Sequence, residues 1–464
     1  MNDNTSTLQS IPKRSWGIAA VTGAGAFMAM LDSTVANLAI ESIREDFSSS
    51  LSIVQWVATG YLCALAVSLP ASAWLGVRYG YGRLWASSLA VFVLASIFCA
   101  IAPDPSTLIV ARLIQGLAGG LMVPAGQAVI GSTIDKRQLG RIFGTLGLVI
   151  ALGPAIGPAV GGFLLDATSW RWLFWINVPI GLIALIAARG LVPRGVGDSN
   201  RVMDFKGFAL LSIGLPLLLF GAFEIGLSGN SQTVIVALIF GTALVILFVF
   251  TALQSKNPLI NLRLLQRTTF STATITTGLT GANMYGGLLV IPIYLQLVAG
   301  MEPLSTGLWF LVMGLGSALV LPVAGSLTDR FGPGVVSLAG TVLLLFSAIP
   351  FVFPQVPSST VLTVSFVARG VGMALAQMPA MTAAYTAVSG EEMGDATTLV
   401  NIVQRMGGAI GAVGLVVIVQ HTGGSTSMTA HNIGFTSLAA ISALTIITAG
   451  LMYRQSKLNP VHDV

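Results

Sequence analysis

The chain has 464 residues, of which 54% are hydrophobic and only 8% are charged, against a usual charged share of about 25%. A soluble protein cannot bury that much apolar surface, so the composition excludes a soluble protein and predicts an integral membrane protein with many spans. The net charge of +5 does not indicate nucleic-acid binding, because the basic residues follow a membrane topology. The two cysteines, Cys63 and Cys99, lie in apolar runs and predict no disulfide framework.

A helix needs roughly 20 apolar residues to cross the membrane, and on this basis the sequence predicts about 14 spanning helices. Their approximate limits are 16–40, 52–77, 83–102, 107–132, 142–165, 172–192, 207–227, 232–253, 269–298, 305–328, 333–353, 360–386, 397–420 and 433–453. The expected fold class is therefore an all-α polytopic membrane protein.

Lysine and arginine are enriched on the cytoplasmic side of membrane proteins, and here they gather at alternate ends of the predicted spans. With a cytoplasmic N-terminus, 17 of the 22 basic residues fall in cytoplasmic segments, and only Arg44 and Arg171 fall outside. The other three, Arg112, Arg369 and Arg405, lie within or near spans. We therefore expect an even number of spans, both termini in the cytoplasm and no binding of nucleic acid.

An internal repeat links the two halves of the chain. AWLGVRYGYGR joins the second and third spans, GSLTDRFGPG joins the tenth and eleventh, and Gly80 corresponds to Gly332, 252 positions later. Each loop is followed two spans on by an arginine, Arg112 or Arg369, which are 257 positions apart. The similar offsets predict two six-helix halves of one fold.

The repeat divides the chain into three parts. Residues 1–192 are expected to form an N-terminal six-helix bundle, and residues 257–464 a C-terminal six-helix bundle with a short tail. Residues 193–256 have no counterpart in the repeat, so they predict a linker with two inserted transmembrane helices.

One predicted helix carries the run GLVIALGPAIGPAVGG, in which Gly153, Gly157 and Gly161 recur every four residues. Small residues at this spacing form a smooth face that lets a second helix approach closely. Pro154 and Pro158 each remove a backbone donor, which predicts a kink. The run is either a tight helix–helix contact or a pivot on which two bundles rock.

Asp32 is a carboxylate inside the first span, about 24 Å along the helix from Trp16 at 1.5 Å per residue. An unpaired charge there costs several kcal/mol, so Asp32 is protonated, paired or facing water. It is a candidate for taking up and releasing a proton, with a structural hydrogen-bonding role as the alternative. Arg112 either assists such a carboxylate or pins two helices. For Arg369 a structural role is expected, and Arg405 either extends toward the interface or pairs with Asp395.

Aromatic, methionine and amide side chains are the candidates for lining a central cavity, which would suit bulky amphipathic or cationic ligands. These residues are Phe27, Met28, Trp56, Tyr61, Tyr285, Tyr294 and Gln296, with Glu224 near the outer end of its span. The loops of the repeat form a candidate cytoplasmic gate, in which Asp329 and Arg330 suit an ion-pair latch. The gate residues are Arg78, Gly80, Arg83, Asp329, Arg330 and Gly332.

Enzymatic chemistry finds no support in the sequence. There is no nucleophile with a base, no phosphate-binding loop and no metal-ligand spacing, and no polar stretch is long enough for a nucleotide-hydrolysing domain. We expect no catalytic residues, no metal and no cofactor, with energy supplied by an ion gradient.

Several motifs in order resemble the 14-helix drug:proton antiporter family of the major facilitator superfamily, the EmrB/QacA type. They are LDSTVANLAI, QWVATGYLCALAVSLPAS, ARLIQGLAGG, GPAIGPAVGG, SWRWLFWINVPIG and NPLINLRLL, and they cover nearly the whole chain. The resemblance implies proton-coupled multidrug efflux by alternating access in the cytoplasmic (inner) membrane of a bacterium. Its implied partners are lipid, protons and amphipathic or cationic small molecules, and we expect a monomer.

The resemblance also implies roles for individual residues. Asp32 would be the protonation or cation-binding site and Arg112 its helper in proton coupling. The hinge face would comprise Gly153, Pro154, Gly157, Pro158, Gly161 and Gly162. Two alternatives remain: a proton-coupled importer of a metabolite on the same fold, and a membrane sensor that transports nothing.

The sequence departs from the family at Val77, where the loop before Arg78 usually carries an aspartate. The first-half gate therefore lacks an acid that the second half keeps as Asp329, which predicts a weaker lock on the outward-facing state. We expect Val77→Asp to shift the balance of inward and outward states and to change the transport rate. Transport assays together with site-specific labelling from each side would measure both, and unchanged values would contradict the prediction.

Overall fold

The computed structural model describes residues 11–198, 200–228 and 232–458; within these ranges a few side chains, including those of 150–156, 158 and 159, are not described. The described residues form helices, joined by turns, with no strand among them. The first ten are α1 (Lys13–Leu38), α2 (Ile40–Asp46), α3 (Leu51–Val54), α4 (Trp56–Ser68), α5 (Ala71–Tyr79), α6 (Tyr81–Ala100), α7 (Pro105–Thr133), α8 (Leu139–Ala167), α9 (Trp172–Trp175) and α10 (Asn177–Leu191). The rest are α11 (Phe205–Ser228), α12 (Gln232–Gln254), α13 (Thr268–Ile293), α14 (Pro303–Phe331), α15 (Pro333–Ala348), α16 (Ser359–Thr386), α17 (Met393–His421) and α18 (Met428–Leu458).

The predicted all-α membrane fold with about 14 spans is confirmed. Thirteen segments of the described chain are long and apolar enough to cross a bilayer. Helix α8, with 29 residues, is as long as several of these and adds a further span. The predicted second span is divided into α3, α4 and α5, with breaks at Gln55 and at Leu69–Pro70, where proline supplies no backbone donor.

The helices form two groups that pack in the same way. In the first half (α1–α10), the pairs α1–α8, α4–α7, α6–α7, α1–α10, α6–α10 and α1–α7 are in contact. In the second half (α13–α18), the corresponding pairs are α13–α17, α14–α16, α15–α16, α13–α18, α15–α18 and α13–α16. The internal repeat read from the loops is thus a repeat of the whole packing scheme.

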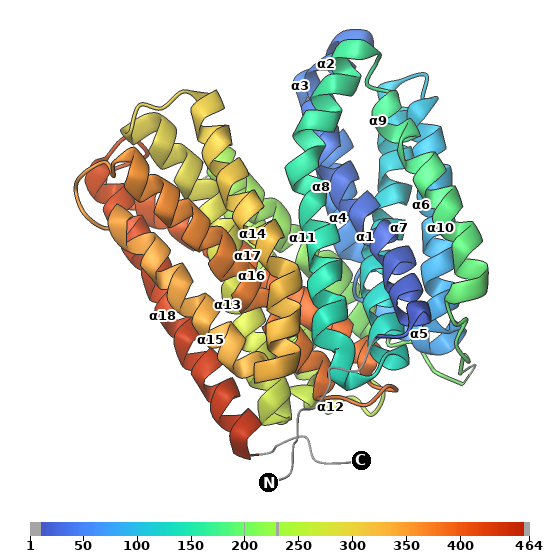
Figure 1. The fold of residues 1–464 in the computed structure, drawn as a ribbon. Helices are drawn as coiled ribbons and strands as arrows, with labels where there is room; N and C mark the ends of the chain where they lie inside the picture. The colour runs from blue at the N-terminus through green and yellow to red at the C-terminus, as the bar shows by residue number, and fades with distance from the viewer. Residues whose placement is uncertain (1–10, 199, 229–231, 459–464) are drawn as a thin grey trace.

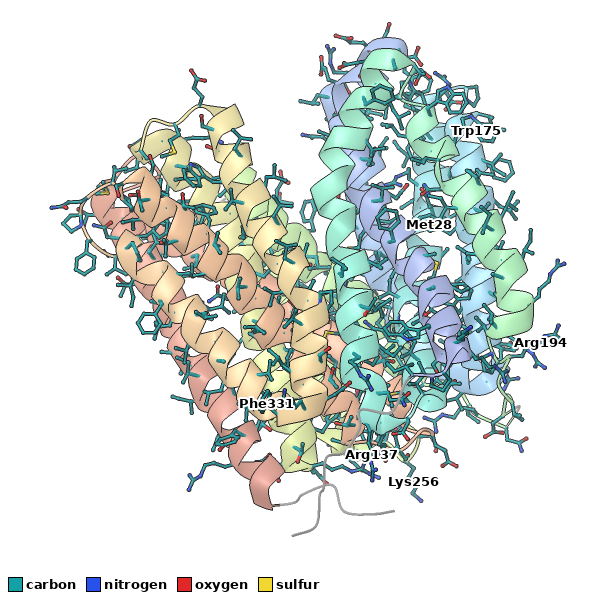
Figure 2. All side chains as sticks on the ribbon, in the orientation of Figure 1. Met28, Arg137, Trp175, Arg194, Lys256 and Phe331 are labelled. Carbon is teal, nitrogen blue, oxygen red and sulfur yellow. The ribbon has the colours of Figure 1, made fainter. Side chains whose placement is uncertain are left out.

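The two ends of the bundle differ in charge. Arg137, Arg194 and Lys256 lie at one end, which we call the basic end, whereas Trp175 lies near the other, the distal end (Figure 2). At the distal end Arg171 donates to Asp46 over 2.7 Å, and this hydrogen bond lowers the pKa of the Asp46 carboxyl. The two halves approach each other toward the basic end and diverge toward the distal end (Figure 1).

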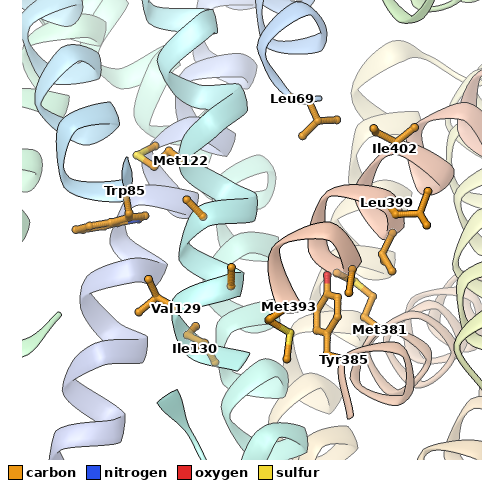
Figure 3. Close-up of a cluster of buried hydrophobic side chains, with 14 of the residues drawn as sticks. Leu69, Trp85, Met122, Val129, Ile130, Met381, Tyr385, Met393, Leu399 and Ile402 are labelled. Atoms are coloured by element: carbon orange, nitrogen blue, oxygen red, sulfur yellow. The ribbon is translucent and has the colours of Figure 1, made fainter. Parts of the chain in front are cut away.

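Apolar side chains from both halves share one core at the basic end. Val129 and Ile130 of α7 gather with Tyr385 of α16 and with Met393 and Leu399 of α17 (Figure 3). Buried hydrogen bonds cross the same contact: the Gln127 amide oxygen accepts from Tyr385 and from Asn401. Ser72 of α5 also hydrogen-bonds Thr398 of α17 over 2.7 Å.

The backbones of the two halves approach each other closely where α8 meets α14. Gly140 and Gly144 of α8 face Gly325 of α14, and a Cβ atom at Gly144 would lie 2.7 Å from the carbonyl oxygen of Leu321. Glycine at these positions lets the two backbones meet at a distance that any side chain would forbid. Helix α8 therefore has a second pair of close-packed glycines, Gly140 and Gly144, before the run that begins at Gly147.

The inserted helix α11 contacts both halves. It packs against α4 of the first half and α17 of the second, and Ser212 of α11 donates to the Val67 carbonyl over 2.8 Å. Helix α12 packs against α11. Helix α12 also contacts the second half directly, because its Val234 shares a buried cluster with Val416 of α17.

Replacing Gly144 with valine is expected to separate α8 from α14, because the new side chain would overlap the α14 backbone. Overpacking of this kind costs about 1–3 kcal/mol, so the variant should unfold at a lower temperature and close less completely at the basic end. Thermal unfolding and spin-label distances across the basic end would measure the two effects.

Gly162→Val is the matched control, because nothing lies within 4 Å of a Cβ atom at that position on the same helix. Equal effects of the two substitutions would show that the α8–α14 contact is not what closes this end.

Candidate functional site

Asp32 and Arg112 form an ion pair inside the first half. Asp32 lies on α1 and Arg112 on α7, and the two side chains are almost fully buried. Arg112 Nη1 donates to Asp32 Oδ2, and Arg112 Nε donates to the Val57 carbonyl over 2.9 Å. The guanidinium also lies 4.2 Å from the ring centre of Tyr61, which adds a cation–π contact.

Amide side chains from two other helix positions complete this site. Gln115 donates to Asp32 Oδ1 over 3.1 Å and accepts from Arg112 over 2.7 Å. Asn177, at the start of α10, donates to the same Asp32 oxygen over 3.2 Å. Ser96 of α6 accepts from both amides. The Asp32 carboxylate thus accepts hydrogen bonds from three donors.

Gln115 and Asn177 were absent from the sequence prediction. A signal for Gln115 was present, because it follows Arg112 by three residues and therefore shares its helix face. Asn177 lies in the SWRWLFWINVPIG motif, but nothing in that motif shows that its amide faces α1.

The ion pair is the element of this site that a proton can change. Protonating Asp32 would remove its charge and leave Arg112 as a buried cation without a counter-ion, which is strongly unfavourable. A neutral carboxyl group carries a proton on one oxygen, so that oxygen becomes a poorer acceptor for its hydrogen-bond donor. Loss of the charge on either side chain would therefore disturb the packing of α1 against α7.

Helix α8 packs against α1 directly after Asp32. A Cβ atom at Gly157 would lie 3.1 Å from Thr34, and one at Gly161 would lie 3.2 Å from Val35. The two glycines therefore form the close helix contact that their spacing predicted. Their partner is α1 in the same half, whereas the contact between halves lies at Gly140 and Gly144.

The remaining residues of the predicted hinge face lie elsewhere on α8. Gly162 points to open space rather than to a helix. The surroundings of Gly153, Pro154 and Pro158 fall outside the described side chains, although the helix continues through them. The hinge role of this motif stays a prediction.

The second-half gate residue Asp329 joins the two halves. At the basic end its Oδ2 accepts from the Arg141 side chain over 2.9 Å and from the Arg141 backbone over 3.1 Å, at the start of α8. The expected latch with Arg330 is wrong, because Arg330 is exposed and its guanidinium lies over the Phe331 ring at 5.1 Å. Adjacent residues on a helix point in different directions, so Asp329 faces α8 while Arg330 faces outward.

The first-half gate residues contact their own half and the linker. Arg78 Nη1 donates to the Arg201 carbonyl over 3.2 Å, and the Arg83 side chain is exposed. Gly80 and Gly332 end α5 and α14 with φ of +93° and +84°, a conformation that favours glycine. The two loops thus share one backbone geometry, while the second contains the acid that bridges the halves.

A cavity of about 220 Å³ lies between α4, α11, α13 and α17. Of the eight predicted lining residues it includes Tyr285, whose ring packs against Gly408. Arg405 also lines it, so the expected pairing with Asp395 is wrong: ten residues separate the two on α17, about 15 Å along a helix.

The other predicted lining residues are placed away from this cavity. Met28, Tyr61 and Tyr294 are fully buried in side-chain clusters, because their helix faces point into the bundle. Phe27 packs at the edge of another cluster, and Trp56 and Gln296 are exposed. Glu224 is half-buried on α11, two positions beyond the lining residue Ala222. A role for these residues in substrate binding stays a prediction.

Arg369 occupies the position of Arg112 in the second half. It is buried on α16 and donates to the Asn283 carbonyl of α13, the counterpart of α1, over 2.7 Å. No ion pair is formed by Arg369 with the described residues. The contact joins α16 to α13, as expected for a structural arginine, whereas the buried ion pair of Asp32 and Arg112 lies in the first half.

Residues 22–412 match the family model described as Major Facilitator Superfamily. The chain belongs to the major facilitator superfamily. It is therefore a multi-pass membrane transporter rather than an enzyme, and the resemblance seen in the motifs is confirmed.

Relatives with similar sequences include transporters named for drug resistance. The Multidrug resistance protein B homolog of Mycobacterium tuberculosis is 34% identical over 390 residues, covering 83% of this chain and 72% of its own. The Putative multidrug resistance protein MdtD of Salmonella typhimurium is 32% identical over 332 residues, covering 70% of each chain. The solved structure of the proton:xylose symporter XylE bound to 6-bromo-6-deoxy-D-glucose has a TM-score of 0.63 at 13% identity, covering 94% of this chain and 95% of its own. That similarity shows the shared fold alone.

Breaking the buried ion pair from one side is expected to destabilise the transporter. Arg112→Met leaves Asp32 without its counter-ion and should cost about 3–5 kcal/mol, whereas the double variant Asp32→Leu with Arg112→Met should recover most of that loss. Thermal unfolding of the purified proteins would measure this. Transport should be lost in both, and recovery of transport in the double variant would contradict a coupling role for the pair.

Proposed function

We propose that this protein is a proton-coupled multidrug efflux transporter that exports amphipathic small molecules by alternating access. The observation that supports this most directly is the position of the Asp32–Arg112 pair. The buried pair joins α1 to α7, close to the glycine contact between α1 and α8. The other end of α8 contacts the second half. The relatives named as multidrug resistance proteins support the substrate class.

The proposed orientation places the basic end in the cytoplasm of a bacterium, with the protein in the inner membrane. Arg137, Arg194 and Lys256 at that end agree with the enrichment of positive charge on the cytoplasmic side. Because the halves meet at this end and diverge at the other, the proposed orientation makes this state closed to the cytoplasm and open to the outside.

The proposed cycle starts from this outward-facing state with an ionised Asp32. Proton binding to Asp32 releases Arg112 from its counter-ion and changes the packing of α1 against α8. Helix α8 transmits that change to Asp329 and to the glycine contact with α14, and the basic end opens. Proton release to the cytoplasm and cargo binding restore the outward-facing state.

Export in exchange for protons and import together with protons make opposite predictions. In proteoliposomes with an acidic lumen, an antiporter accumulates a fluorescent amphipathic dye inside, whereas a symporter does so with an alkaline lumen. A panel of anionic, neutral and permanently cationic dyes, with protein-free liposomes as the reference for passive partitioning, would measure the direction. We expect accumulation with an acidic lumen and simultaneous proton release.

Asp32→Asn should abolish the response to the pH gradient. Asp166→Asn is the matched control, because Asp166 is an exposed acid near the end of α8. Dye movement by the Asp32 variant that still follows the pH gradient, or uphill transport with the gradient collapsed, would refute proton coupling through this residue.

A further inference from the structure

The cavity between the halves has apolar walls and one charged side chain. Leucine and alanine side chains of α4, α11, α13 and α17 supply much of its surface, with the ring of Tyr285 on one side. Arg405 is the charged residue among those that line it. It projects from α17 and also borders a smaller hollow formed by α4 and α11.

Arg405 differs in its surroundings from the other two arginines predicted within or near spans. Arg112 is neutralised by Asp32, and Arg369 donates to a backbone carbonyl. Among the described residues, Arg405 takes part in no hydrogen bond and no ion pair. Its guanidinium therefore has its donors available to whatever occupies the cavity.

The acids near this region are placed elsewhere. Asp32 is enclosed by the Arg112 network within the first half, and Asp329 is bound to Arg141 at the basic end. Glu224 lies on α11 beyond the lining and has an interaction of its own. The cavity thus presents a positive charge in an apolar setting, where charge complementarity is stronger than in water.

We propose that this cavity binds amphipathic anions, with Arg405 as the counter-ion of a carboxylate or sulfonate and the leucine walls and Tyr285 around the apolar body. A guanidinium presents a planar fork that matches such groups with two parallel hydrogen bonds. The same charge disfavours a permanently cationic ligand. The proposal revises the expected preference for cations, and it rests on the proposed function in naming the substrate class of that transporter.

Tyr285 adds a preference for flat ligands. The ring packs directly against Gly408, where a Cβ atom would overlap it, so the absence of a side chain at Gly408 sets how the ring lies along the cavity. An aromatic ligand can stack on this ring while its acidic group reaches Arg405.

A measurement of ligand affinity, which does not depend on transport, tests the proposal. Three naphthalene compounds that share one alkyl chain and end in a carboxylate, a primary amide or a trimethylammonium group would be titrated calorimetrically into the purified full-length protein. We expect the carboxylate to bind about tenfold more tightly than the amide, because a hydrogen bond to a charged group is worth roughly 1.4 kcal/mol or more, and the ammonium compound to bind most weakly.

Arg405→Gln should remove the difference between carboxylate and amide, and Arg405→Lys should keep part of it. Arg454→Gln removes an arginine from the exposed end of α18 and should leave all three affinities unchanged. If Arg405→Gln fails to fold, the wild-type ranking and Arg405→Lys still decide. Equal wild-type affinities, or a carboxylate preference that survives in Arg405→Gln, would overturn the proposal.

Failure of the proposed function gives a different result. Anion preference through Arg405 without pH-driven dye accumulation would refute proton-coupled export and leave the anion site in place. Accumulation driven by the pH gradient without charge preference would do the reverse.

Discussion

The rest of the structure depends on an ion pair that is almost fully buried. Asp32 and Arg112 neutralise each other, Gln115 and Asn177 donate to the carboxylate, and the Val57 carbonyl accepts from Arg112 Nε. Arg112 Nη2 has no hydrogen-bond partner among the described residues. A pair of this kind contributes little net stability, yet it is intolerant of losing one member. A change of charge at either side chain would therefore act on the packing of α1 against α7.

Helix α8 relates this pair to the contact between the halves. Its C-terminal part lies on α1 through Gly157 and Gly161, one turn after Asp32. Its N-terminal part lies on α14 through Gly140 and Gly144, and Arg141 binds Asp329 there. One continuous helix therefore contacts both the helix that carries Asp32 and the opposite half of the protein.

Features with a local signature were predictable from the sequence. The spans follow from apolar length, and Asp32 and Arg112 were conspicuous as charges inside apolar runs. The Arg141–Asp329 bridge could not be found, because its partners are 188 positions apart and each looks like an ordinary residue at a helix end. Gly140 and Gly144 were not predicted, because they lie before the glycine-rich motif that begins at Gly147. The cavity walls depend on how four helices are rotated, and helical periodicity is weak where most faces are apolar.

Helix α11 forms one wall of the cavity between α4, α13 and α17, and this wall comes from outside the two repeated halves. Leu219 and Ala222 of this helix face the cavity, whereas the acid–base pair and the α8 contacts lie entirely in the repeated helices. A twelve-helix version of the fold without this segment would leave that side exposed to lipid tails. The walls of this cavity can thus change through substitutions in one inserted helix while the ion pair and the α8 contacts of the repeated helices stay constant.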